Sequence, residues 1–171
     1  MTIGFYENFP INIHRFDRFN STLSIKHLQQ RLVQVLKDVN RKEFSFEEIT
    51  NPTVPDGRVI FEFGLAESGD FNYLNEEEVK RILSLLTKER LHSMDFFCSI
   101  RYYKGSGINR SALKFDYYML RTIFSKDILE VQVFHERGPR YLSPEELTMF
   151  IFSKVNEESS RNRKILKKTT N

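Results

Sequence analysis

The chain has 171 residues, of which 40% are hydrophobic and 29% are charged. This length and balance are typical of one soluble globular domain with a sizeable core, and they exclude a mainly disordered chain. The only cysteine, Cys98, cannot form an intramolecular disulfide, so we expect a reducing, cytoplasmic location. No apolar run approaches the length that crosses a bilayer, and we expect no membrane partner.

The formal net charge of +3 is concentrated at the end of the chain. Residues 157–171 contain five basic and two acidic side chains, which leaves residues 1–156 formally neutral with 21 of each sign. We therefore predict one α+β domain over residues 1–156 and a basic tail, frayed or extended, over residues 157–171. A polyanion would have to bind a local patch of the domain, with weak and salt-sensitive help from the tail.

The spacing of apolar residues predicts two strands and two helices before residue 90. Capping residues precede both helices, and acidic residues in the first turn favour the second one. In chain order we expect a strand at 11–19, a helix from caps at 20–24 to about Val39, a short strand or irregular segment at 44–49, a turn at 51–57, a strand at 59–65, a loop at 67–73 and a helix at 76–90.

The rest of the chain predicts three strands and a final helix. Strict alternation of apolar residues over 94–103, followed by two glycines, indicates a hairpin whose second arm is residues 108–116. Another strand is expected at 128–135, and Ser143-Pro144-Glu145-Glu146 has the pattern of a helix start. The order β-α-β-α-β-β-β-α favours an α+β fold: a largely antiparallel sheet with about three helices packed on one face, which leaves the other face free for a partner.

The hairpin and the residues after it, 94–121, are the predicted working surface. Cations that can pair with phosphates alternate there with rings that can stack on unpaired bases. The residues that we expect to contact RNA are Arg101, Lys104, Arg110, Lys114, Arg121, Tyr102, Tyr103 and Tyr117. Aromatic residues and exposed cations are also common in any sheet, and this structural reading is about twice as probable from the pattern alone.

The sequence contains no pattern that predicts an enzyme. The four histidines are scattered without metal-binding spacing, and the glycines of the hairpin lack the third glycine and the helix of a nucleotide loop. Cys98 lies on the apolar side of its strand, where a thiol is inert. We expect no catalytic residue, no metal and no cofactor. Asp95 and Asp116 could hold magnesium if they faced each other, but a solubilising surface pair is the favoured reading.

With the elements in this order, residues 11–151 resemble a family of archaeal exosome-associated proteins predicted to bind RNA, whose fold is that of the ribosomal protein that binds 5S RNA. The resemblance is carried by the stretches IHRFDRFNSTLSIKHLQQRLVQVLKDV and EEEVKRILSLLTKERLHSMDFFCSIRYY and by Leu113-Lys114-Phe115-Asp116. Only Lys114 and Asp116 match the family's functional pattern, because Tyr117, Tyr118 and Met119 follow where the family has other residues. The resemblance implies RNA binding without catalysis.

The sequence thus leads to two hypotheses from different classes. The first is a non-enzymatic RNA-binding protein of RNA processing or translation. The alternative is a protein-interaction or homodimerisation subunit of a larger complex, in which the excess of Phe and Tyr covers a partner. The formally neutral charge of residues 1–156 agrees with this alternative.

Overall fold

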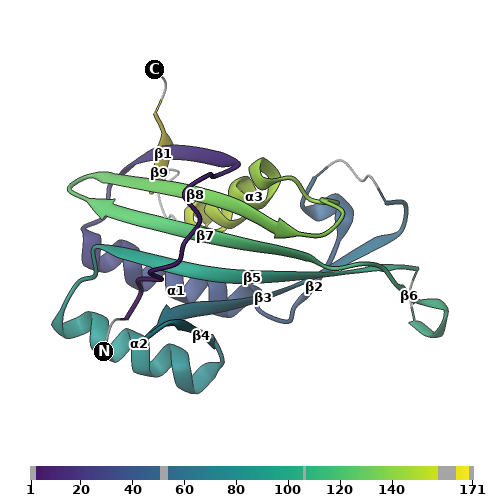
Figure 1. Cartoon of the computed structure of the whole chain (residues 1–171), viewed down its shortest axis with the longest axis horizontal. Coiled ribbons are helices and arrows are strands. Elements are labelled where there is room, and N and C mark those ends of the chain that lie inside the picture. The colour runs from purple at the N-terminus through teal and green to yellow at the C-terminus, as the bar shows by residue number, and fades with distance from the viewer. Residues whose placement is uncertain (1–2, 51–53, 106, 158–164, 170–171) are drawn as a thin grey trace.

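A computed structural model describes residues 3–50, 54–105, 107–157 and 165–169. Within these residues nine strands form one antiparallel sheet, in the order β2-β3-β5-β7-β8-β1-β9, with β4 paired to β3 and β6 paired to β5 (Figure 1). The strands are β1 Arg15–Ser21, β2 Glu43–Ser45, β3 Gly57–Glu67, β4 Asp70–Tyr73, β5 Ser93–Lys104, β6 Ser111–Ala112, β7 Asp116–Ser125, β8 Ile128–Arg137 and β9 Leu166–Lys168. The predicted α+β fold is confirmed.

The α-helices of the described residues are α1 Ile25–Val39, α2 Glu76–Lys88 and α3 Pro144–Glu157; α1 and α3 lie against one face of the sheet, and α2 packs beside α1 at the β4 edge. Each begins at a predicted cap. The side chain of Ser24 accepts a hydrogen bond from the backbone N–H of His27 at 3.2 Å, and Asn75 does the same for Glu78 at 2.8 Å. Two short 3-10 turns complete the list: η1 Phe46–Glu48 and η2 Gly107–Asn109.

The core lies between the helices and one face of the sheet. Alternate residues of β5, from Met94 to Tyr102, point toward the helices and are buried. The phenylalanine excess is used here, since rings from β2, β3 and α3 pack in one cluster that includes Phe61 and Phe150, 5.1 Å apart. The remaining residues of each central strand point to the other side, which we call the open face.

The sequence predicted that the open face would be free. In the structure, part of it is covered. Residues 3–14, here the N-terminal strap, run across it before entering β1, on the side opposite α1 and α3 (Figure 1). Residues 11–14, expected at the start of the first strand, belong to this strap, and β1 begins at Arg15. Gly4 inserts where β3 and β5 separate, donating to the carbonyl of Ala66 at 2.7 Å and accepting from the N–H of Asp95 at 2.6 Å.

The second strand of the hairpin lies later in the chain than the predicted residues 108–116. β5 pairs with β7 from Ser93 opposite Ile123 to Ile100 opposite Asp116, so residue 116 begins the main strand rather than ending one. Residues 103–105 and 107–115, here the arm, form the end of the molecule marked β6 in Figure 1, where Tyr103 and Lys104 still pair with β3 and β6. Alternation alone could not locate the start of β7, because apolar residues continue on both sides of Asp116.

Two further segments differ from the prediction. Residues 70–73, expected in a loop, form β4 against the end of β3. Part of the predicted tail forms β9, in which Leu166 is buried and Lys168 pairs with Asp17 at 3.1 Å. A short strand was not expected there because its pairing partner, β1, is about 145 residues away in sequence. Residues 158–164 and 170–171 of that tail lie outside the described residues.

Candidate interaction surface

The eight predicted RNA-contacting residues are divided between the two faces of the sheet. Tyr102 points toward the helices and is 1% exposed, so it belongs to the core and cannot stack on a base. Arg101, Tyr103, Tyr117 and Arg121 lie on the open face, and each is half-buried. The prediction that Tyr102 contacts RNA is therefore wrong, for the geometric reason that neighbouring strand residues point to opposite sides.

Asp116 is the centre of a buried hydrogen-bond network beneath the arm. One carboxylate oxygen accepts from the Tyr102 hydroxyl at 2.6 Å and from the backbone N–H of Tyr141 at 3.0 Å. The other accepts from His135 Nε2 and from the backbone N–H of Arg140, both at 2.8 Å. Four donors satisfy the carboxylate, so Asp116 fixes the loop before α3 and is not open to a ligand.

Burial keeps two tyrosine hydroxyls and the cysteine thiol near Asp116 protonated. Burial raises the pKa of the Tyr102 hydroxyl far above its usual value, and the negative charge of Asp116 raises it further. Burial and the same carboxylate raise the pKa of Tyr118, whose hydroxyl donates to the carbonyl of Leu142. Burial likewise raises the pKa of the Cys98 thiol. None of these groups is poised as a nucleophile or base near neutral pH.

Asp95 and Arg121 form an ion pair that anchors the N-terminal strap. Two guanidinium nitrogens of Arg121 donate to the two carboxylate oxygens at 2.9 Å each, and a further bond from Arg121 reaches the carbonyl of Tyr6 at 2.9 Å. The backbone N–H of Tyr6 donates to Asp95 at 2.7 Å. The rings of Phe5 and Phe9 flank the guanidinium at 5.0 and 4.5 Å. Arg121 therefore holds the chain's own backbone, instead of the phosphate predicted for it.

The same pair excludes the shared magnesium site. Asp95 lies on the open face and Asp116 on the helix face, so the two carboxylates cannot coordinate one ion. Within the described residues, no three His, Cys, Asp or Glu side chains gather as metal ligands.

Two more of the five predicted cations also have carboxylate partners. Arg101 pairs with Glu62 at 2.7 Å, and Arg110 pairs with Glu43 at 2.7 Å. The Arg110 guanidinium also lies 3.6 Å from the centre of the Tyr103 ring, which occupies one face of that ring. Lys104 and Lys114 are exposed and make no ion pair within the described parts of the chain. The cations are thus dispersed among acids more than the sequence suggested.

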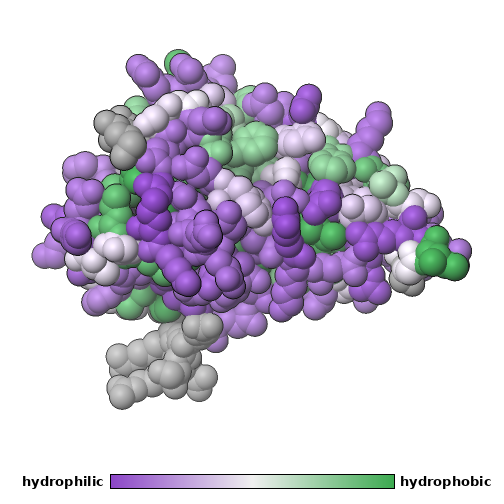
Figure 2. Space-filling view, turned by 90° about the horizontal axis from the view of Figure 1, so that it is seen from below, coloured by the Kyte–Doolittle hydropathy of each residue, from purple (hydrophilic) through white to green (hydrophobic). Residues whose placement is uncertain are grey.

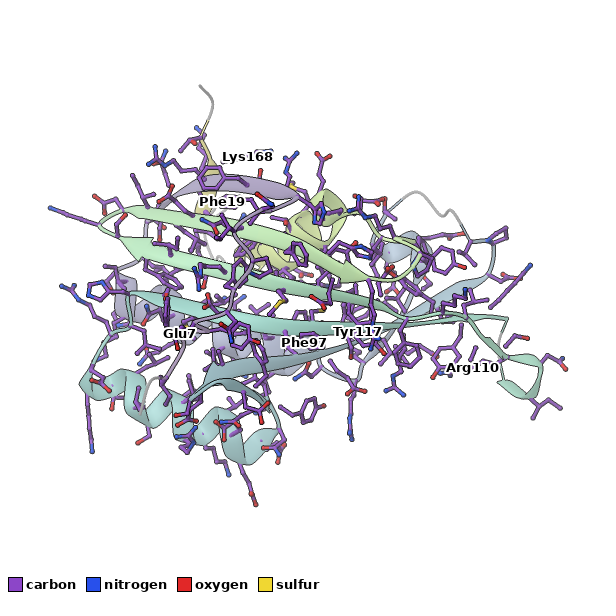
Figure 3. The ribbon with its side chains drawn as sticks, viewed as in Figure 1. Glu7, Phe19, Phe97, Arg110, Tyr117 and Lys168 are labelled. Atoms are coloured by element: carbon purple, nitrogen blue, oxygen red, sulfur yellow. The ribbon has the colours of Figure 1, made fainter. Side chains whose placement is uncertain are left out.

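The structure instead brings aromatic rings together across the open face. Neighbouring ring centres are 4.8 Å apart for Tyr6 and Phe71, 5.7 Å for Phe71 and Phe97, 5.9 Å for Phe97 and Tyr117, and 6.0 Å for Tyr117 and Phe115. We call these five residues the aromatic run. Figure 3 shows Phe97 and Tyr117 side by side on the sheet, with Arg110 farther out on the arm. The run extends from the strap to the base of the arm.

A cavity of about 550 Å³ opens beside this run, between the strap and the strands; we call it the open-face groove. Its lining residues are Tyr6, Asn8, Pro10, Asp70, Phe71, Phe97, Met119 and Glu136. Phe97 and Met119 come from neighbouring positions of β5 and β7, so they form its apolar floor. Asp70 and Glu136 are exposed and have no cationic partner among the described residues. The groove is therefore aromatic with an acidic rim.

Most of this surface does not follow from local sequence patterns. Phe97 alternates with the buried residues of β5, so a ring on the polar side of that strand is the one signal that the sequence offers. Tyr6 and Phe71 reach the surface through the strap and β4, neither of which was predicted. Tyr6 and Phe71 are 65 residues apart in sequence, and Phe71 and Phe97 are 26 apart, which is beyond the range of local periodicity.

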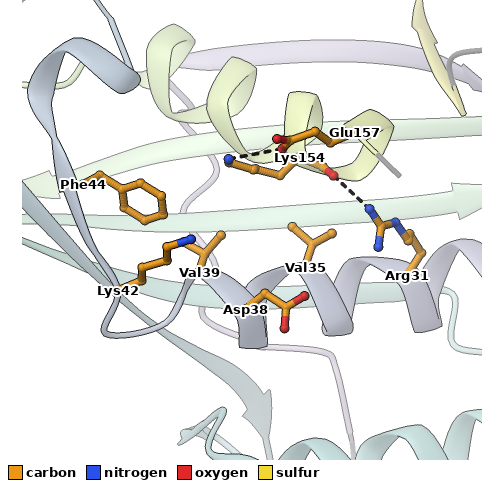
Figure 4. A pocket seen from close by; sticks show the side chains of 8 residues that line it. All are labelled: Arg31, Val35, Asp38, Val39, Lys42, Phe44, Lys154 and Glu157. Carbon is orange, nitrogen blue, oxygen red and sulfur yellow. Dashed lines mark hydrogen bonds and ion pairs between the residues drawn. The ribbon is translucent and has the colours of Figure 1, made fainter. Parts of the chain in front are cut away.

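A second cavity, of about 380 Å³, lies between α1 and α3 (Figure 4). There Arg31 donates to the last carbonyls of α3, at 3.0 Å to Lys154 and 3.3 Å to Val155. Lys154 pairs with Glu157 at 3.2 Å. Because the guanidinium satisfies helix-end carbonyls and the remaining charges are mixed, this cleft has a structural role in joining two helices.

Comparison of the chain with protein-family models, with curated proteins and with solved structures gave no match. The resemblance to the exosome-associated family therefore stays a prediction. Among the described residues, no helix is long and apolar enough to span a membrane.

Proposed function

We propose that this protein is a non-enzymatic protein-interaction module that binds its partner through the open face. The observation that carries the proposal is the aromatic run, which leads from the arm into the open-face groove. Aromatic side chains are enriched in protein interfaces and supply much of their binding energy.

The charges beside the open-face groove favour a protein over a polyanion. Arg101 and Arg121 are neutralised by carboxylates, and the rim of the groove carries Asp70 and Glu136. Phosphates would be repelled by that rim, whereas a polypeptide can present both apolar and basic side chains to it. The buried groups near Asp116 are satisfied or neutral, which favours a binding role over catalysis.

Photo-cross-linking inside cells that express the protein tests the proposal. A benzophenone amino acid replaces Phe97 in the groove, and the matched control carries it at Met149, which is 48% exposed on α3. We expect a discrete protein adduct at position 97 that nuclease treatment leaves intact and that is absent at position 149. No adduct at position 97, or one that nuclease removes, would overturn the proposal.

RNA binding is kept as a second candidate because one observation favours it. Lys104 and Lys114 make no ion pair within the described residues, and Arg58, which lies opposite Tyr103 in the sheet, makes none either. These cations surround the base of the arm, where Tyr103 and Tyr117 are half-buried. Proteins that bind single-stranded RNA place unpaired cations beside aromatic rings, because the cations pair with phosphates and the rings stack on bases.

The RNA candidate predicts a salt-dependent affinity for single-stranded RNA. Fluorescence anisotropy should show that Lys104→Glu/Arg110→Glu/Lys114→Glu weakens binding by at least about tenfold. A control with equal charge change, Lys80→Glu/Lys126→Glu/Lys37→Glu, alters other parts of the surface and should retain affinity. Equal affinity of both triple variants would remove the arm from any RNA site.

A further inference from the structure

The arm has the properties of an insertion element. Ile108 at its tip is fully exposed, and Figure 2 shows a small apolar (green) spot at the tip of a projecting end whose remaining surface is mostly hydrophilic. An isoleucine in this position stabilises nothing within its own chain. Lys104 and Lys114, on the two sides of the arm, are also exposed and unpaired among the described residues. The arm thus offers one apolar and two cationic groups.

The arm is held in place by its base. Arg110 is fixed by Glu43 at 2.7 Å and by the ring of Tyr103 at 3.6 Å. The N–H of Gly105 donates to the carbonyl of Asp56 at 3.1 Å, on the side of β3. These contacts tie the base of the arm to β2 and to the turn before β3, at the end of the sheet marked β6 in Figure 1. A pre-organised arm loses little entropy when it binds.

The open-face groove has the complementary properties. Its floor, which includes Phe97 and Met119, can receive an aliphatic side chain, and its rim places two unpaired carboxylates, Asp70 and Glu136, where ammonium groups could meet them. Lysines matched with carboxylates, and an exposed isoleucine matched with an apolar floor, give both charge and hydrophobic complementarity.

We propose that the groove receives the arm of a second copy of this chain. The inference rests on the proposed protein-interaction function and names the partner. Two copies packed open face against open face about a twofold axis would place each arm over the other's groove. The aromatic runs would then lie between the two groove-and-arm contacts, and the assembly would close as a dimer.

Charge-swap variants test this arrangement in the purified full chain. The groove variant Asp70→Lys/Glu136→Lys and the arm variant Lys104→Glu/Lys114→Glu each put like charges at both contacts, and each should weaken dimerisation by about tenfold or more. A mixture of the two variants should recover dimers, because both contacts are then between opposite charges. Sedimentation velocity over a concentration series gives the dissociation constants, and circular dichroism confirms folding.

The control Lys80→Glu/Lys126→Glu changes the same number of lysines away from the arm and the groove, and it should dimerise like the wild type. A wild-type protein that stays monomeric overturns the second copy as partner. So does a mixture that fails to recover dimers. A monomer that still gives the discrete protein adduct at position 97 would leave the interaction module standing with a different partner, so the two failures are distinguishable.

Discussion

The strap end and the arm end of the open face use the same kinds of residues for different purposes. At the strap end, Arg121 pairs with a carboxylate that is 0% exposed, and aromatic rings cover the guanidinium. At the arm end, Arg110 pairs with the exposed Glu43, and Lys104 has no partner among the described residues. Burial of the partner decides the role. Arg121, beside a buried acid, holds the fold together, whereas Lys104, beside solvent, is free to bind.

The largest effect should come from breaking the pair at the strap end. Arg121→Ala leaves the carboxylate of Asp95 buried without its counter-charge, so the free energy of unfolding should fall by about 3–5 kcal/mol. The control at the arm side is Arg101→Ala, whose pair with Glu62 is about one-third exposed on both sides, and its cost should stay below about 1 kcal/mol. Urea unfolding followed by circular dichroism measures both.

Equal losses in these two variants would contradict the distinction between the two ends. A further check is hydrogen exchange of the strap, because the N–H of Tyr6 is protected by Asp95. Arg121→Ala should raise exchange at Tyr6 more than at the arm, since only the strap depends on that pair.

A smaller effect should come from Gly4, which fixes the strap between β3 and β5. Its φ is +85°, and an added Cβ would lie 2.6 Å from the carbonyl oxygen of Ser93. Gly69 is the matched control, because its φ is +84° but an added Cβ there would meet nothing within 4 Å. Both Ala substitutions carry the backbone strain of about 1–2 kcal/mol, and only Gly4→Ala adds a clash.

Thermal unfolding should therefore give a lower Tm for Gly4→Ala than for Gly69→Ala. The excess reports the fit of the strap, independently of any charge. A Gly69→Ala variant that loses as much as Gly4→Ala would show that the strap is loosely placed and that the strap end is not the rigid one.

The sequence predicted what depends on local periodicity. The helix caps at Ser24 and Asn75, the alternation of β5 and the helix start at Ser143 all appear where expected. It did not predict which acids would be buried, because Asp95 and Asp116 have the same residue type and both lie in strands of one hairpin. Their roles are set by partners that come from distant segments: the strap for one, β8 and the loop before α3 for the other. Such partners follow from topology and not from spacing.

Tyr102 and Tyr118 are buried on the helix face of the sheet, beneath the arm. Burial raises the pKa of both hydroxyls above the value of about 10 that they regain on unfolding. Above pH 10 the unfolded chain therefore loses protons that the folded chain keeps. The stability that these tyrosines contribute is fully present below pH 10. It should fall above that pH by up to about 1.4 kcal/mol per pH unit for each tyrosine.

Urea unfolding at several pH values, from neutral pH to above pH 10, measures how steeply the free energy of unfolding falls with pH. Tyr102→Phe removes one of the two hydroxyls, so it should reduce the slope even though it also lowers stability at neutral pH by depriving Asp116 of a donor. The slope, and not the absolute stability, is the diagnostic quantity. A wild-type protein whose stability is constant across this range would mean that the region beneath the arm is open to water. The arm would then lack the fixed base from which it is proposed to reach a second copy.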